Sequence, residues 1–570
     1  MNLRKSCSED AIGRGGRQFI VAGLSRVRCP AALWPGSWRA RHRTLESPAT
    51  IARSLAVLCC LAWILLPVFA QPTASVQGTV RGPDGPIAGA IVRQQTTTNF
   101  VLSDDGGNFL LSGLTAGKEI IVTAWKESFY PAALTLTPPQ TGVSFNLVRH
   151  PDQDNPDYKW LPSYADGKEP LACEHCMVEF PQWKVDAHSQ SAVNRRFLSL
   201  YLGTNLAGSR QGGGYVDDFP GTSGSCANCH GPGAAVQQPF ATYMNQLSGV
   251  ELEGVLCDFC HKIADVYIER GTGLPYSNMP GIQSFKRNRP PAGTHMFYGT
   301  FDDIPRRVAR LDLEKKSQFC APCHQFSFWG TPVYESFREW LESSYPKRGI
   351  ECQGCHMVPP GTTPYFVFLD QGGKVRDPKL ISSHLMPGAV DLPLLKNTVD
   401  MRVDTEWRRG EILVRVTLTN TGAGHHVPTD FPGRQMLLVV AAQDSSHNPL
   451  SLRAGATIPQ WGGAQAGRAG KVYAKILKDV LTGEKPVVTY WKQTLIDSDT
   501  RLAAEAVDTT EYRFATPASG APAEVSVQLL FRRVFDQVRT ERNWDIGDIV
   551  MEESRELVFP ASRRPRPQVR

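Results

Sequence analysis

The chain has 570 residues, and at about 100 to 200 residues per domain this length predicts about three to five domains. Its composition, 41% hydrophobic and 20% charged, excludes disordered, collagen-like and multi-spanning membrane proteins. Residues 1–53 carry nine Arg and one Lys against three acidic residues, a local charge of +7, which leaves residues 54–570 close to neutral at −1. We therefore expect no nucleic-acid partner.

The first 70 residues are interpreted as a leader that ends in a secretory signal. An apolar run from Ser54 to Ala70 follows Arg53, and small residues precede a cleavage point near Gln71. The run has about 15 apolar residues, fewer than the ~20 that span a bilayer, so an uncleaved anchor is the alternative rather than the first choice. We expect a periplasmic, extracellular or cell-surface protein with no stable membrane span once the signal is removed.

Residues 71–150 have an all-β pattern. Short runs rich in β-branched residues are separated by turn sequences such as GPDGP and DDGGN, and Ile87, Val92, Phe109 and Leu111 occupy the apolar positions. This predicts a small β-sandwich. At residues 73–148 the sequence resembles the carboxypeptidase regulatory-like domains, a family of Ig-like sandwiches. Since no zinc peptidase module accompanies it, the resemblance implies a spacer or adhesion module.

The rest of the chain divides by composition. Residues 151–170 are rich in Pro, Asp and Asn and are predicted to be a linker. Residues 171–398 hold ten of the fourteen cysteines and form the site-bearing part, expected to be loop-rich and α-helical. Residues 399–562 return to strand patterns, EILVRVTLTN, RQMLLVVAAQD and EVSVQLLFRR, which predict a second β-sandwich. Residues 563–570 are a basic, Pro-rich tail.

The central part repeats the pattern C-x-x-C-H four times. Two thiols three residues apart can form thioethers with the vinyl groups of one haem, and the adjacent His can bind its iron. The alternatives are two four-thiolate zinc sites and short disulfides, although neither requires a His after every second Cys. The sequence therefore predicts four covalently bound haems c, held by the cysteines Cys226, Cys229, Cys257, Cys260, Cys320, Cys323, Cys352 and Cys355 and the proximal ligands His230, His261, His324 and His356.

A fifth pair, CEHCM from Cys173 to Met177, has Met in the place of the proximal His. It is interpreted first as a disulfide or a site that has lost its haem. The alternative is a fifth haem with Met177, His175 or no side chain as axial ligand. Four haems are the count that we expect.

Electron-transfer haems need a second axial ligand, so histidines outside the motifs are candidates. Four of them follow or precede Gly, Pro or a helix start: His188, His295, His384 and His425. His426 adjoins His425, and neighbouring side chains on an extended loop point to opposite faces, so only one of the two can serve. Met296 and Met386 compete with His295 and His384 but are expected to be core residues.

These residues resemble the multihaem c-type cytochromes, in the broad group that contains the tetrahaem cytochromes of hydroxylamine oxidation. The likeness covers residues 170–440 and includes the C-x-x-C-H motifs, the WKVDAH stretch ending at His188 and the NTGAGHHVPTD loop from Asn420 to Asp430. The resemblance implies stacked haems with bis-His iron and little regular structure between them, and it favours His425 over His426.

We therefore expect an electron-transfer cytochrome and not an enzyme, with redox proteins or an extracellular acceptor as partners. Two alternatives remain open. One is a multihaem oxidoreductase in which one haem keeps an open coordination position for a small nitrogen or sulfur compound. The other is a subunit of a haem-stacked extracellular filament. The sequence predicts no particular oligomeric state.

Overall fold

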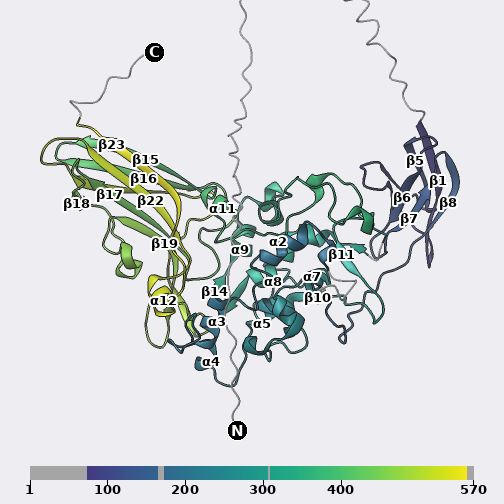
Figure 1. Cartoon of the computed structure of the whole chain (residues 1–570), viewed down its shortest axis with the longest axis horizontal. Helices are drawn as coiled ribbons and strands as arrows, with labels where there is room; N and C mark the ends of the chain where they lie inside the picture. The colour runs from purple at the N-terminus through teal and green to yellow at the C-terminus, as the bar shows by residue number, and fades with distance from the viewer. Residues whose placement is uncertain (1–72, 165–172, 306–307, 561–570) are drawn as a thin grey trace, which may run out of the picture. The chain divides into compact units, whose positions relative to one another are not determined.

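The computed structural model describes residues 73–164, 173–305 and 308–560 (Figure 1). The leader and signal predicted for residues 1–70 lie outside the described residues, as does the basic tail at 563–570. The predicted β-rich parts at both ends are confirmed, and each contains two sheets.

The first β-rich part is a pair of four-stranded sheets. One sheet has the order β2-β1-β5 with β8 parallel to β1, and the other has the order β4-β3-β6-β7. Alternate residues of both sheets, such as Val80 and Val122, are fully buried in one shared core. This explains why the period-two pattern could be read from the sequence. The strands are β1 (Thr73–Gly82), β2 (Gly85–Pro86), β3 (Ile91–Gln94), β4 (Phe100–Leu102), β5 (Asn108–Thr115), β6 (Ile120–Trp125), β7 (Ala132–Leu136) and β8 (Gln140–Asn146).

Residues 151–164, predicted to be a linker, are packed against the central part. Asp154 pairs with the buried Arg289 at 2.7 Å. The Tyr158 hydroxyl donates to Asp258, and the Trp160 indole donates to the Gly233 carbonyl. Specific contacts thus hold the described part of the predicted linker, residues 151–164, against the central part.

The central part is built from very short elements. Its longest helix in the described residues has eight residues, and three two-stranded sheets that the sequence did not predict lie between the helices. The helices are α2 (Glu179–Val185), α3 (Arg195–Leu202), α4 (Tyr215–Asp218), α5 (Ala227–His230), α6 (Pro232–Ala235), α7 (Cys257–Cys260), α8 (Ala321–His324), α9 (Ser336–Glu342), α10 (Gln353–His356) and α11 (Leu392–Lys396). The strands are β9 (Ile263–Val266), β10 (Phe285–Arg287), β11 (Phe297–Gly299), β12 (Val308–Arg310), β13 (Phe326–Phe328) and β14 (Thr331–Tyr334).

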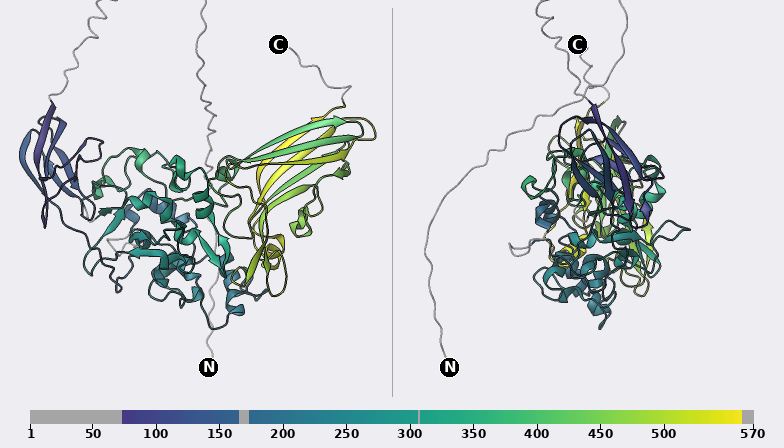
Figure 2. Two further views of the ribbon diagram at one scale, coloured as in Figure 1. Left: turned by 180° about the vertical axis from the view of Figure 1, so that it is seen from behind. Right: turned by 90° about the vertical axis from the view of Figure 1, so that its right-hand side faces the viewer.

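The second β-rich part has long antiparallel strands, green to yellow in Figure 2, that lie side by side and twist together. Its sheets have the orders β15-β16-β21-β18 and β20-β19-β17-β22-β23 and share a core of aliphatic and aromatic residues. The three strand runs named from the sequence lie in β16, β17 and β22. The elements are β15 (Val399–Arg408), β16 (Glu411–Asn420), β17 (Gln435–Gln443), β18 (Leu452–Ala454), β19 (Gly470–Asp479), β20 (Thr494–Asp499), β21 (Val507–Ala515), β22 (Ala523–Arg532), α12 (Asp536–Glu541) and β23 (Ile549–Val558).

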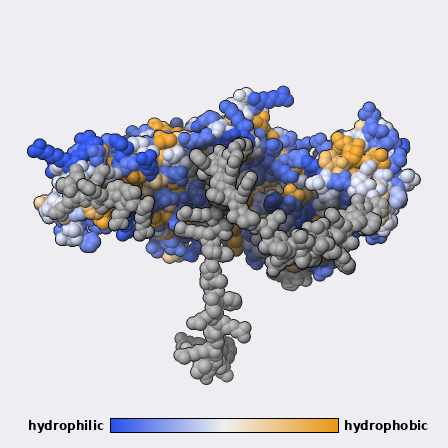
Figure 3. Space-filling view, turned by 90° about the horizontal axis from the view of Figure 1, so that it is seen from above, coloured by the Kyte–Doolittle hydropathy of each residue, from blue (hydrophilic) through white to orange (hydrophobic). Residues whose placement is uncertain are grey.

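No helix in the described part of the chain is long and apolar enough to cross a membrane. The face drawn in Figure 3 is mainly hydrophilic, and its hydrophobic residues lie in separate patches.

Candidate functional site

Each C-x-x-C-H motif forms one turn of helix. In all four, the amide of the His donates to the carbonyl of the first Cys, with N···O distances of 2.9 to 3.2 Å. This i to i+4 hydrogen bond closes a helical turn, so the two thiols and the imidazole project from the same short segment. The turns are α5, α7, α8 and α10. One local geometry is therefore repeated four times, and it is the geometry that attachment of a haem requires.

The motifs also contact one another through their thiols. Cys323 hydrogen-bonds with Cys229, and Cys320 hydrogen-bonds with Cys352. The hydrogen bond from Cys320 lowers the pKa of Cys352 to about 7, although burial opposes the shift. The motif at Cys320 and Cys323 therefore touches two others, which makes the attachment points immediate neighbours.

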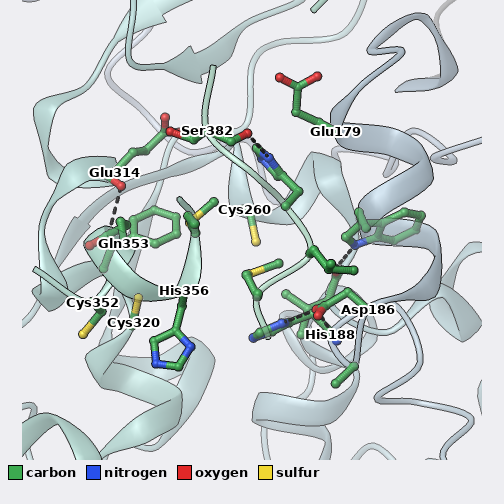
Figure 4. Close-up of a pocket in the computed structure, with 18 of the residues that line it drawn as sticks. Glu179, Asp186, His188, Cys260, Glu314, Cys320, Cys352, Gln353, His356 and Ser382 are labelled. Atoms are coloured by element: carbon green, nitrogen blue, oxygen red, sulfur yellow. Dashed lines mark hydrogen bonds and ion pairs between the residues drawn. The ribbon is translucent and has the colours of Figure 1, made fainter. Parts of the chain in front are cut away.

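The motifs open into one large cavity of about 2060 Å³. An ordinary small-molecule pocket has about 300 to 1,000 Å³, so this cavity has room for several large groups. All four motif histidines and all four predicted distal histidines line it, together with seven of the eight motif cysteines. Figure 4 shows His188 and His356 in this cavity with the sulfur atoms of Cys260, Cys320 and Cys352.

Three motif histidines face a predicted distal histidine across the cavity. The ring centres are 6.3 Å apart for His261 and His384, 6.4 Å for His356 and His425, and 6.3 Å for His188 and His324. Two imidazoles that bind one metal ion from opposite sides, each with a nitrogen about 2 Å from the metal, have ring centres about 6 Å apart. The three pairs thus have the spacing of bis-His coordination.

The six paired rings are also oriented by hydrogen bonds. In each, Nδ1 lies within 2.6 to 3.4 Å of an oxygen that can only accept, so Nδ1 donates its proton there and Nε2 is the nitrogen left to face a metal. Metal-bound histidines are commonly held in this way. The carboxylate of Asp186 accepts from His188, and that of Asp430 accepts from His324. Backbone carbonyls accept from the other four rings: Tyr298 from His261, Pro387 from His356, Ser382 from His384 and His426 from His425.

The loop from Asn420 to Asp430 serves two of these pairs. It places His425 opposite His356, while the carboxylate of Asp430 accepts from His324 at 3.1 Å. His426 also lines the cavity, and its Nδ1 lies 3.3 Å from a carboxylate oxygen of Glu339. The structure thus places His425, and not His426, against a motif histidine. Three supporting carboxylates were not predicted: Asp186, Asp430 and Glu314, whose oxygen lies 3.2 Å from Nδ1 of His261. Asp186 and Asp430 lie within the two stretches that carry the family resemblance.

His230 differs from the other motif histidines. Across the described ranges 73–164, 173–305 and 308–560 it faces no second imidazole at the 6 Å spacing, and its ring stacks instead on Phe197 at 3.9 Å and 1°. Burial lowers the pKa of His230 to about 4, so the ring is neutral and able to bind a metal. His295 lines the cavity but is not paired with any motif histidine there, so its role as a distal ligand stays a prediction.

The CEHCM segment does not form the same turn. The Cys176 amide donates to the Cys173 carbonyl, but the Met177 amide donates to Phe366 from another segment, at 2.8 Å. Its Cys173 thiol hydrogen-bonds with Cys257, and this contact and burial raise the pKa of Cys173. The fifth pair therefore lies beside the second motif but lacks both the His and the helical turn that presents it.

The donor set fits haem better than the alternatives. None of the ten cysteines in the described residues forms a disulfide, and no three His, Cys, Asp or Glu side chains there gather into a site for a bare ion. Within these residues the cysteine pairs are not brought together as a four-thiolate site requires. A haem c bound at each turn would supply one-electron Fe(III)/Fe(II) chemistry. The cysteines of each motif would attach it, and at three sites a motif histidine and a second histidine could each offer a nitrogen to its iron.

Glu179 on α2 is a buried carboxyl group in the same cavity. Burial raises its pKa to about 7, and its Oε2 has no hydrogen-bond partner in the described part of the chain (Figure 4). Above pH 7 the negative carboxylate favours ferric over ferrous iron, so the midpoint potential of a nearby haem is expected to fall as the pH rises from 6 to 8. The slope for one coupled proton is at most about 59 mV per pH unit.

Potentiometric titrations of the holoprotein at several pH values test this expectation. Glu179→Gln should remove the dependence between pH 6 and 8, while Glu174→Gln, an exposed neighbour, should keep it. An unchanged slope in Glu179→Gln would contradict the role of this carboxyl group.

No protein-family model and no curated protein matches the sequence. Among solved structures, a penta-heme cytochrome c552 from Thermochromatium tepidum is similar over 68% of this chain and 98% of its own, with a TM-score of 0.51 and 20% identity. A Northeast Structural Genomics Consortium target, SoR45, covers 30% of this chain and 96% of its own with a TM-score of 0.15 and 10% identity, too little to inform the fold. The main part of this chain thus shares its fold with a multihaem c-type cytochrome.

Proposed function

We propose that this protein is a secreted multihaem c-type cytochrome that relays electrons one at a time through four covalently attached haems. The observation that carries the proposal is the set of three imidazole pairs at 6.3 to 6.4 Å, each with one motif histidine and one distal histidine. Histidine on both faces of the iron leaves no position for a substrate, which is the arrangement that electron transfer needs.

Contacts between the motifs support a relay. Because thiols of neighbouring motifs hydrogen-bond with each other, haems attached to them would also be neighbours. Electrons could then pass along the cavity from one haem to the next. The apolar run before residue 71 supports export, and export matches a redox partner or acceptor outside the cytoplasmic membrane.

A second candidate function is favoured by His230. This motif histidine has no imidazole partner in the described residues, so a haem at Cys226 and Cys229 would have one axial nitrogen from the chain and an open opposite position. Such a site could bind and reduce or oxidise a small nitrogen or sulfur compound, with the three bis-His sites delivering or removing electrons.

The first experiment is the intact mass of the mature protein from a host that attaches haem c, with an optical and EPR spectrum of the same sample. A mass with four haems and four low-spin signals supports the relay alone. Four haems with one high-spin signal that shifts on adding nitrite or cyanide supports the second candidate. A mass without haem would overturn both.

A further inference from the structure

Three arginine side chains line the cavity on the side of His230. Arg196 belongs to α3, directly before the Phe197 that stacks on His230. Arg434 directly precedes β17, and Arg533 directly follows β22. All three are half-buried and contribute to the cavity wall. Two of them therefore come from the C-terminal β-rich part, far from the haem motifs in the sequence.

The pairing of two strands brings two of these charges to the same end of a sheet. β17 and β22 are antiparallel and their ladder ends at the pair Gln435 and Arg532, so Arg434 and Arg533 are the next residues beyond that end. Burial and then the charges of Arg196 and Arg434 lower the pKa of Arg533, which places the three guanidinium groups within electrostatic reach of one another.

The protein neutralises this cluster only in part. Arg196 forms an ion pair with the exposed Asp545, and Arg434 donates to the Thr429 carbonyl at 3.1 Å. Asp430 is near Arg434 but already accepts from His324. Arg533 has no hydrogen bond or ion pair in the described residues, and its buried Nε lacks an acceptor. Asp545 is thus the one carboxylate that pairs directly with these three arginines in the described structure.

The neighbours of the cluster connect it to the first motif. Tyr334 and Tyr490 share a hydroxyl–hydroxyl hydrogen bond of 3.1 Å. Both hydroxyls lie within electrostatic reach of the Cys226 thiol, and that of Tyr334 also of Arg434. The aromatic side chains of Tyr490 and Trp544 complete the wall beside the arginines. Phenol and guanidinium groups are hydrogen-bond donors, so this side of the cavity wall, which also includes Cys229, presents donors with excess positive charge.

We propose that Arg196, Arg434 and Arg533 form a binding site for an oxyanion beside the haem attached at Cys226 and Cys229. The bound group is a carboxylate or a small inorganic oxyanion such as nitrite, because a planar guanidinium matches the paired oxygens of such groups. The proposal rests on the proposed attachment of that haem. Two sources have this chemistry, a propionate of the haem itself and a free anion from solution.

The test compares nitrite binding to holoprotein variants by calorimetry, which measures binding whether or not the iron changes. Arg533→Gln removes the charge that has no partner, and Arg453→Gln on the exposed strand β18 is the matched control. The dissociation constant for nitrite should rise about tenfold or more in Arg533→Gln and stay unchanged in Arg453→Gln. Sulfate, an oxyanion that does not bind iron, should compete with nitrite. If Arg533→Gln lacks haem or does not fold, Arg196→Gln takes its place.

The outcomes distinguish a haem propionate from a free anion as the bound group. They also distinguish failure of the oxyanion site from failure of the proposed function. If the wild type binds no nitrite but the Arg533→Gln variant lowers the midpoint potential of one haem, the occupant is the propionate. If nitrite binds with no change in the haem spectrum, the oxyanion site stands while the open iron position fails. Equal nitrite affinity and equal potentials in the wild type and Arg533→Gln would overturn the site. Absence of haem in the intact mass would overturn the proposed function instead.

Discussion

Replacing His425 by alanine is expected to convert one low-spin, six-coordinate iron to a high-spin, five-coordinate iron. His425 faces His356 at 6.4 Å, and its Nδ1 proton is held by a carbonyl, so its Nε2 is directed to the metal position. With a haem at each of the three paired sites, the change should remove about one third of the low-spin signal. EPR spectra of the ferric protein measure this loss, and added imidazole should restore the signal by filling the vacated position.

The matched control is the neighbouring residue. His426→Ala removes an imidazole one residue away that pairs with Glu339 and has no motif histidine opposite. It should leave the low-spin signal complete and affect only stability. If His426→Ala produced the high-spin signal and His425→Ala did not, the assignment of the loop would be reversed.

Replacing both Cys352 and Cys355 by serine is expected to lower the intact mass by one haem. The two thiols and His356 form the single turn α10, and serine cannot form the thioethers that retain the group. The loss would also expose part of the cavity wall, so a fall in the thermal midpoint of unfolding is expected as well. Mass spectrometry under denaturing conditions counts the haems that stay attached even if the variant is unstable.

The control for this variant uses the fifth pair. Cys173→Ser with Cys176→Ser should leave the mass unchanged apart from the two oxygen-for-sulfur exchanges, because CEHCM lacks the His and the closed turn. A mass lower by one haem in this double variant would show that the fifth pair also carries a haem.

The features that were predicted from the sequence are those encoded within a few residues. A C-x-x-C-H motif is one helical turn long, so its geometry follows from its spacing and is the same at α5, α7, α8 and α10. The strands β16, β17 and β22 were predicted for a similar reason, since apolar residues repeat along each of them. The distal candidates His188, His384 and His425 were found by counting the ligands that four haems require.

What was not predicted depends on contacts between distant segments. The pairing of His188 with His324 joins residues that lie 136 positions apart, and no local pattern specifies it. His295 has the same kind of local setting as the other candidates, yet the described structure gives it no motif partner. The arginines at the ends of β17 and β22 look like ordinary strand-end charges in the sequence, and only the pairing of these strands reveals that they lie at the same end of the ladder.

The order of the ligands along the chain has a consequence for how the protein matures. All four proximal histidines precede residue 357, whereas His384 and His425 come later and His425 lies on a loop anchored by β16. In the proposed haem-loaded protein, the pair of His356 and His425 would form only once the C-terminal β-rich part has folded against the central part. Low-spin ligation at that site would therefore report the folding of the C-terminal part.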